Sequence, residues 1–203
     1  NGDRSWMYGL NAGYDSRPMN TGGTDTGINV SGTEKSAFFQ QVAVNAEAVS
    51  NDWNFNAYAL IPIVDTEQDL NFFYLGGALD TYGLDVGYFI TPELNASVGY
   101  YYQHGDLGSA DGSGVLGRVA YEISSGLTAG VNVSYDEAFE TRVSADLKVR
   151  FGGAATTAKR KEVQQHPVIN ALTSTPSHRD VRVHDGAVCD DFDCLVDTFG
   201  KEK

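Results

Sequence analysis

The chain has 203 residues, 41% of them hydrophobic, and a formal net charge of −13. This length allows one all-β domain with a tail. The acidic balance argues against a nucleic-acid partner, because phosphate binding needs clustered Lys and Arg. The longest apolar stretch, residues 57–64, is far shorter than the roughly 20 apolar residues of a spanning helix. A mean hydropathy of −0.28 suits a soluble protein, yet it equally suits membrane strands that alternate lipid-facing and polar residues.

Alternation of apolar with polar or small residues marks eight segments in the first 151 residues. In chain order they are residues 6–14, 42–48, 53–63, 82–90, 94–103, 115–123, 127–136 and 142–151. A strand points successive side chains to opposite faces, so each segment predicts a strand with one apolar face. Most are close to the ~9–11 residues that a tilted strand needs to cross a bilayer.

The connections between these segments alternate in length. Short turns at 50–52, 91–93 and 124–126 alternate with longer connections at 16–36, 64–80, 105–114 and 136–140. In an up-and-down meander this puts every long loop at one rim and every tight turn at the other, as in outer-membrane barrels. A soluble β-sandwich is the alternative, because its strands also alternate.

Aromatic residues and composition favour the barrel over the sandwich. The aromatics on the apolar phase are Trp6, Tyr8, Tyr14, Trp53, Phe55, Tyr82, Tyr88, Tyr100, Tyr102, Tyr121, Tyr135 and Phe151. Many lie near segment ends, as an interfacial girdle requires, while the opposite face is too polar and Gly-rich for a packed core. We therefore predict an all-β, antiparallel, up-and-down transmembrane β-barrel over residues 1–152, with eight readable strands, and a polar, irregular linker or tail over 153–203.

The polar phase of the strands predicts which residues face the barrel lumen. They are Asn11, Glu47, Asp85, Asn95, Arg118, Glu122, Asn132, Arg142, Asp146, Lys148 and Arg150. Opposite charges on neighbouring strands neutralise one another most simply across the ladder. Residues 1–151 carry a net charge of −12, from 7 basic and 19 acidic residues, so the tail, with −1, contributes little to the acidity.

Catalytic and metal chemistry finds little support in the sequence. His104 lies at a strand end, where it is more simply interpreted as a solvated rim residue than as a general base. The Gly-x-Ser-x-Gly motif is absent. The loop at 105–112 lacks the acidic spacing of a calcium site. We predict no enzyme activity, cofactor or metal; an outer-membrane enzyme is the weakest alternative. Cys189 and Cys194 could form a disulfide in an oxidising compartment or stay as two unpaired thiols.

Several short runs carry a resemblance to a known family. The run Trp6-Met7-Tyr8-Gly9-Leu10-Asn11-Ala12-Gly13-Tyr14-Asp15-Ser16-Arg17 resembles an early hairpin of the inverse autotransporter β-domain, the translocator of the intimin and invasin adhesins. The similarity continues through the strand of Glu47, Tyr82-Gly83-Leu84-Asp85 and the closing Lys148-Val149-Arg150-Phe151-Gly152. The run His178-Arg179-Asp180-Val181-Arg182-Val183 resembles the linker of that family.

The resemblance implies a twelve-stranded outer-membrane barrel whose C-terminal linker threads back through the pore and carries an adhesive passenger to the cell surface. The expected partners are the lipid bilayer, the barrel-assembly machinery through the strand ending at Phe151, and a cell-surface ligand bound by the passenger. Because eight strands are readable, we expect further strands before Asn1 and a passenger beyond Lys203. A stand-alone small pore or structural barrel is the alternative, with its signal peptide removed just before Asn1.

Overall fold

The structure, a computed structural model, describes residues 6–21, 35–50, 52–70, 74–105, 110–124, 126–149 and 180–187. Every element that it describes is a β-strand. They are β1 (Met7–Thr21), β2 (Lys35–Val49), β3 (Trp53–Ile63), β4 (Glu67–Asp69), β5 (Tyr74–Ala78), β6 (Asp80–Phe89), β7 (Leu94–His104), β8 (Gly112–Ser124), β9 (Leu127–Asp136), β10 (Glu140–Val149) and β11 (Val183–Ala187). These residues include no helix with the length and hydropathy of a membrane span.

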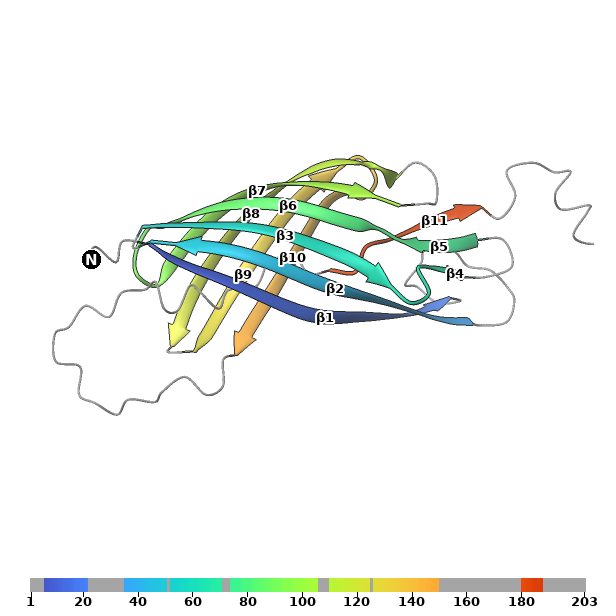
Figure 1. The fold of residues 1–203 in the computed structure, drawn as a ribbon, viewed down its shortest axis with the longest axis horizontal. Helices are drawn as coiled ribbons and strands as arrows, with labels where there is room; N and C mark the ends of the chain where they lie inside the picture. Colours follow the sequence, from blue (N-terminus) through green and yellow to red (C-terminus); the bar gives the residue numbers. More distant parts are fainter. Residues whose placement is uncertain are drawn as a thin grey trace, which may run out of the picture.

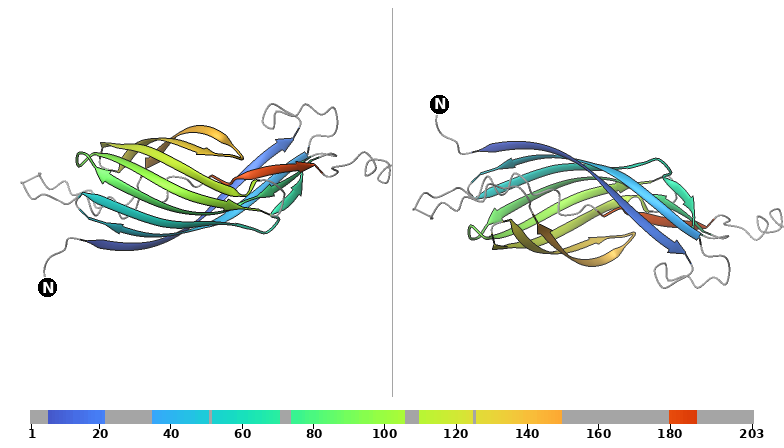
Figure 2. Two further views of the ribbon diagram at one scale, coloured as in Figure 1. Left: turned by 90° about the horizontal axis from the view of Figure 1, so that it is seen from above. Right: turned by 90° about the horizontal axis from the view of Figure 1, so that it is seen from below.

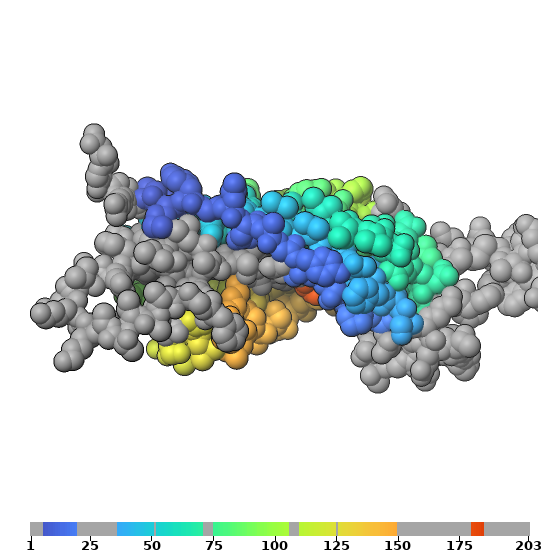
Figure 3. Space-filling view, turned by 60° about the horizontal axis from the view of Figure 1, so that its bottom comes forward, coloured from blue at the N-terminus to red at the C-terminus, as the bar shows by residue number. Residues whose placement is uncertain are grey.

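Eight strands form one antiparallel sheet in the order β1-β2-β3-β6-β7-β8-β9-β10. The sheet curls into a half-barrel, and its strands run side by side along the long axis (Figures 1 and 2). The strand order leaves β1 and β10 as the two edges. Figure 3 shows both edges on the same side of the molecule, β1 in blue and β10 in orange. The prediction of eight antiparallel strands in meander order is confirmed, while closure into a barrel is not part of the described pairing.

The two rims of the half-barrel differ as the spacing of the segments predicts. The strand ends next to 50–52, 90–93 and 125–126 lie at one rim, here the short-turn rim. The strand ends next to 22–34, 64–79, 105–111 and 137–139 lie at the other, the long-loop rim. In the first short turn the Ser50 N–H donates to the Trp53 carbonyl at 2.7 Å. In the last, Gly126 has φ 86°, a left-handed conformation that glycine adopts without steric cost.

The two faces of the sheet differ in polarity in the way that the alternation predicts. The convex face carries exposed apolar side chains on all eight strands, among them Leu10 at 85% exposure, Val98 at 68% and Leu147 at 63%. The concave face instead buries polar groups such as Gln41 and Asn132. An apolar outside over a polar inside is the reverse of a soluble sandwich, whose core would be the apolar face.

Large side chains on the concave face lie over glycines of the neighbouring strand. A Cβ added at Gly83 would lie 2.2 Å from the ring carbon Cζ of Tyr58, and one at Gly114 would lie 2.1 Å from Cζ of Tyr101. Each tyrosine is the direct cross-strand partner of its glycine. The sequence suggested that this face is too rich in glycine for a packed core. Its glycines instead provide the space in which the large side chains lie flat.

Two features of the strands differ from the sequence prediction. The strands β1 and β2 pair from Met7↔Val49 up to Thr21↔Lys35, so they extend well into the connection that we predicted at 16–36. The predicted connection at 64–80 contains the strands β4 and β5, which pair with each other. Strand β5 also pairs with β11, which gives a second, three-stranded sheet of order β11-β5-β4. The longer β1 and β2 and the additional strands β4 and β5 all depend on pairing with a partner strand rather than on local alternation of the sequence.

Candidate functional site

The segment 180–187, from the predicted tail, lies at the long-loop rim. Its strand β11 pairs antiparallel with β5, from Val183↔Ala78 to Ala187↔Tyr74. Just before β11, the Leu79 N–H donates to the Arg182 carbonyl at 2.9 Å. The segment is thus added as a third strand to the β4–β5 hairpin (Figure 1), which is the main-chain mode of peptide recognition by strand addition.

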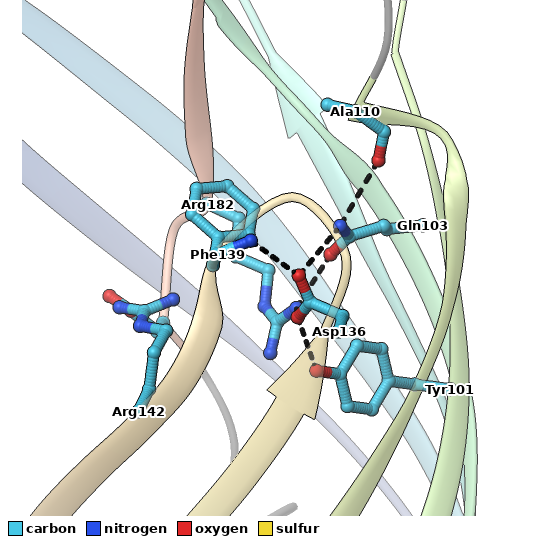
Figure 4. A network of polar contacts seen from close by, with 8 residues as sticks. Tyr101, Gln103, Ala110, Asp136, Phe139, Arg142 and Arg182 are labelled. Atoms are coloured by element: carbon cyan, nitrogen blue, oxygen red, sulfur yellow. Dashed lines mark hydrogen bonds and ion pairs between the residues drawn. The ribbon is translucent and has the colours of Figure 1, made fainter.

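Arg182 is the most deeply buried charged residue of this segment, at 1% exposure. Its Nη1 donates to Asp136 Oδ2 at 2.9 Å and to Gln103 Oε1 at 2.6 Å. The guanidinium carbon lies 4.2 Å from the centre of the Tyr101 ring, which adds a cation–π contact. Figure 4 shows these side chains converging from β7, the end of β9 and the C-terminal segment. We call Arg182, Asp136, Gln103 and Tyr101 the Arg182 clamp.

Asp136 has enough donors around it to remain buried as a carboxylate. Besides Arg182, it accepts hydrogen bonds from the Tyr101 hydroxyl at 2.5 Å and from the Phe139 N–H at 2.7 Å. Gln103 Nε2 lies 3.4 Å from Oδ1 and also donates to the Ala110 carbonyl at 3.1 Å. A buried ion pair offsets its desolvation only when its remaining hydrogen-bonding groups are satisfied, and most of those of Asp136 are.

Further contacts connect the segment to both edge strands of the sheet. Asp180 forms an ion pair with Arg142 of β10, which is about one-third exposed. Arg17 of β1 donates from Nη1 to the Val181 carbonyl at 2.9 Å. The segment thereby holds the two unpaired edges of the half-barrel at one rim, where Figure 3 shows a small red part of it between β1 and β10.

An apolar cluster completes the site. Val181, at 3% exposure, packs with buried residues from β2 and from the β4–β5 hairpin. The members of the cluster are Ala37, Phe39, Leu70, Ala78 and Val181, with Met19 and Val183 packed against it. Val181 and Val183 thus face the apolar cluster, while Arg182 between them faces the clamp. This alternation specifies both the register and the direction in which the segment binds.

Ten of the eleven predicted lumen-facing residues lie on the concave phase of their strands. Glu47, Asp85, Arg118 and Asn132 are buried there, and Asn11, Asn95, Glu122, Arg142, Asp146 and Lys148 are partly buried. The side chain of Arg150 lies outside the described residues. The structure brings Arg118 and Asp146 together in a two-pronged ion pair, and Asn132 contributes a further hydrogen bond to each of them.

The remaining sequence predictions concern the loops and the tail. His104 Nδ1 lies 2.7 Å from Asp111 Oδ2 at an exposed position. A hydrogen bond donated by the Gly105 N–H, together with the contact to His104, lowers the pKa of Asp111 below its ordinary value. No group of three or more metal-ligating side chains occurs among the described residues. Cys189 and Cys194 lie outside them, as does Phe151.

Sequence reasoning did not identify the clamp itself. Tyr101, Gln103 and Asp136 lie on the polar phase of the predicted segments 94–103 and 127–136, and the resemblance includes Arg182 in the linker. Their convergence depends on a contact between residues 79 positions apart, Gln103 and Arg182. A signal was present in the run of Arg179, Asp180 and Arg182 inside a polar tail, but no local pattern identifies its partners.

The fold and the site together define a class: an antiparallel curled sheet with an apolar outer face and a polar inner face, which holds a segment of its own C-terminal region at one rim. Comparisons with protein-family models, with curated proteins and with solved structures found no match to this chain.

Proposed function

We propose that this chain is the outer-membrane translocator or anchor of an inverse-autotransporter-type adhesin, with a linker that crosses the half-barrel and leaves it at the long-loop rim. The observation that carries the proposal is the position of the segment 180–187. Strand β10 ends with Val149 at the short-turn rim, and Asp180 lies at the long-loop rim beside Arg142, near the start of β10. Between these two residues the chain must cover the height of the sheet.

Contact with lipid is supported by the convex face. Exposed apolar side chains on eight adjacent strands form a far larger apolar surface than soluble monomers expose. Near the short-turn rim this face also carries aromatic rings in contact: the ring centres of Trp53 and Tyr88 are 4.9 Å apart, and those of Trp6 and Phe55 are 5.7 Å apart. Aromatic rings at this level are typical of the interface between a membrane and water.

A stand-alone pore accounts for fewer of these observations. A passive channel needs an open interior, whereas here Arg182 and Val181 are buried and hold a segment of the chain against the concave face. A display function needs such a segment, because the chain must leave the barrel on the side opposite to the end of its last strand.

An epitope test separates the two readings. The full chain is expressed with a signal peptide and carries one epitope either after Lys203 or before Asn1. We expect antibody to label intact cells only for the C-terminal epitope, because Trp6 lies at the short-turn rim and Ala187 at the long-loop rim. Heat-modifiable migration on a gel after detergent extraction serves as the control for insertion. Labelling of the N-terminal epitope alone, or loss of heat-modifiable migration, would contradict the proposal.

A further inference from the structure

Three polar residues lie side by side in one row of the concave face. Glu47 of β2 pairs with Asn56 of β3, and Asn56 pairs with Asp85 of β6. Directly paired side chains on one face have Cβ atoms about 4.5–5.5 Å apart. The row, here the acidic row, therefore places two carboxylates on either side of one amide. The two carboxyl groups lie over Gly9 and Gly99, the next residues along the row: a Cβ added at Gly9 would lie 2.6 Å from Glu47 Oε1, and one at Gly99 would lie 2.0 Å from Asp85 Oδ1.

Each residue of the acidic row has one buried side-chain oxygen without a hydrogen-bond partner in the described part of the chain. Glu47 is 4% exposed and Asp85 is 5% exposed. Among the described residues, Glu47 Oε2, Asn56 Oδ1 and Asp85 Oδ1 have no hydrogen-bond donor, and the same holds for the Tyr58 hydroxyl in the next row. Unpaired carboxylate oxygens away from water are costly, so this arrangement calls for a group that carries both positive charge and N–H donors.

Cations on two other strands of the sheet, β8 and β10, attract the row electrostatically. Lys148 of β10 attracts Glu47 electrostatically, and Arg118 of β8 attracts Asp85. Arg118, however, directs its guanidinium to Asp146 and Asn132. Among the described residues, neither cation donates a hydrogen bond to Glu47 Oε2, Asn56 Oδ1 or Asp85 Oδ1.

We propose that the acidic row binds the basic run Lys159-Arg160-Lys161 of this chain. The stretch 150–179 contains five basic residues and one acidic residue, which complements the two carboxylates. Its two ends are fixed at opposite rims, at Val149 and Asp180. Lys159 is ten residues beyond Val149, and ten extended residues span up to about 33–36 Å. The acidic row lies close to the short-turn rim, since Glu47 is two residues before the end of β2 and Asp85 is four residues before the end of β6, so it is within reach of the run. The inference deepens the proposed function, since it names the wall residues that hold the linker.

A pair of engineered cysteines tests this contact in the full-length protein. In a background with Cys189→Ser and Cys194→Ser, Asn56→Cys is combined with Arg160→Cys. The matched control combines Ala57→Cys with Arg160→Cys, because Ala57 is the next residue of β3 and is exposed on the convex face. After oxidation of the inserted protein, we expect a disulfide-dependent gel shift for the first pair and its loss for the control. No shift for the first pair, or equal shifts for both, would overturn the inference.

A second measurement needs no substitution. A zero-length carbodiimide reagent joins amines to carboxylates that touch, so peptides of the unaltered chain should show Lys159 or Lys161 joined to Glu47 or Asp85. Links from these lysines only to other carboxylates would overturn the inference. The epitope and heat-modifiability results decide the proposed function separately, because a translocator whose linker takes another path would retain both of them.

Discussion

The substitution Arg182→Met should release the segment 180–187 from the rim. It removes hydrogen bonds to Asp136 and Gln103 from a side chain that is fully buried, beside an aspartate whose side chain is 1% exposed. Removing one partner of a buried ion pair costs about 3–5 kcal/mol. Asp136 keeps the donors of Tyr101 and Phe139, so we expect the lower end, about 3 kcal/mol, or roughly a hundredfold in the docking equilibrium.

Amide hydrogen exchange of the full-length protein in detergent micelles measures this release. The amides of β11 that pair with β5 should lose about a hundredfold of their protection in Arg182→Met, because local opening sets their exchange rate. The matched control is Arg142→Met, which removes the partly exposed ion pair to Asp180 and should cost no more than ~1 kcal/mol. Unchanged protection in Arg182→Met, or equal losses in both variants, would refute the clamp as the main attachment.

Three further predictions concern the glycines of the concave face, the apolar convex face and the topology. Gly114→Val should lower folded-state stability by ~1–3 kcal/mol, since its Cβ would meet the Tyr101 ring. The control Gly112→Val should be tolerated, because no heavy atom lies within 4 Å of the new Cβ; thermal gel-shift assays compare the two variants. Val131→Arg on the convex face should cost ~2–4 kcal/mol near the membrane midplane, measured by urea unfolding in lipid vesicles, and equal stability would speak against lipid contact. A protease site inserted after Val64, which is 71% exposed, should be cut on intact cells, while the same site after Pro92 should be protected; the opposite pattern would invert the topology.

The alternation of the sequence was sufficient to predict the eight strands and their two faces. Val143 and Leu147 lie on the exposed face and Arg142 and Asp146 on the partly buried one, because a period of two is a direct consequence of strand geometry. The far ends of β1 and β2 lacked that signal. Pro18 interrupts the pattern there, and the pairing up to Thr21↔Lys35 comes from the partner strand.

Contacts between distant parts of the chain could not be predicted in this way. Strand β4 has three residues and β5 contains Gly76 and Gly77, so neither has the composition of a strand on its own. Strand β5 pairs with β11, more than a hundred residues away, and β4 pairs with β5. The Arg182 clamp has the same origin, because the phase of a strand says which face a side chain takes but not which distant segment meets it.

The pairing of β11 also determines how the molecule responds to mechanical tension. In the proposed function, a passenger held by another surface pulls on the chain beyond Ala187. This force acts along β11, so it loads the hydrogen bonds from Val183↔Ala78 to Ala187↔Tyr74 together in shear rather than one after another. Behind them, Arg182 transmits the load through Asp136 to the end of β9. An adhesin under flow would thus be held by the β4–β5 hairpin and by the end of β9.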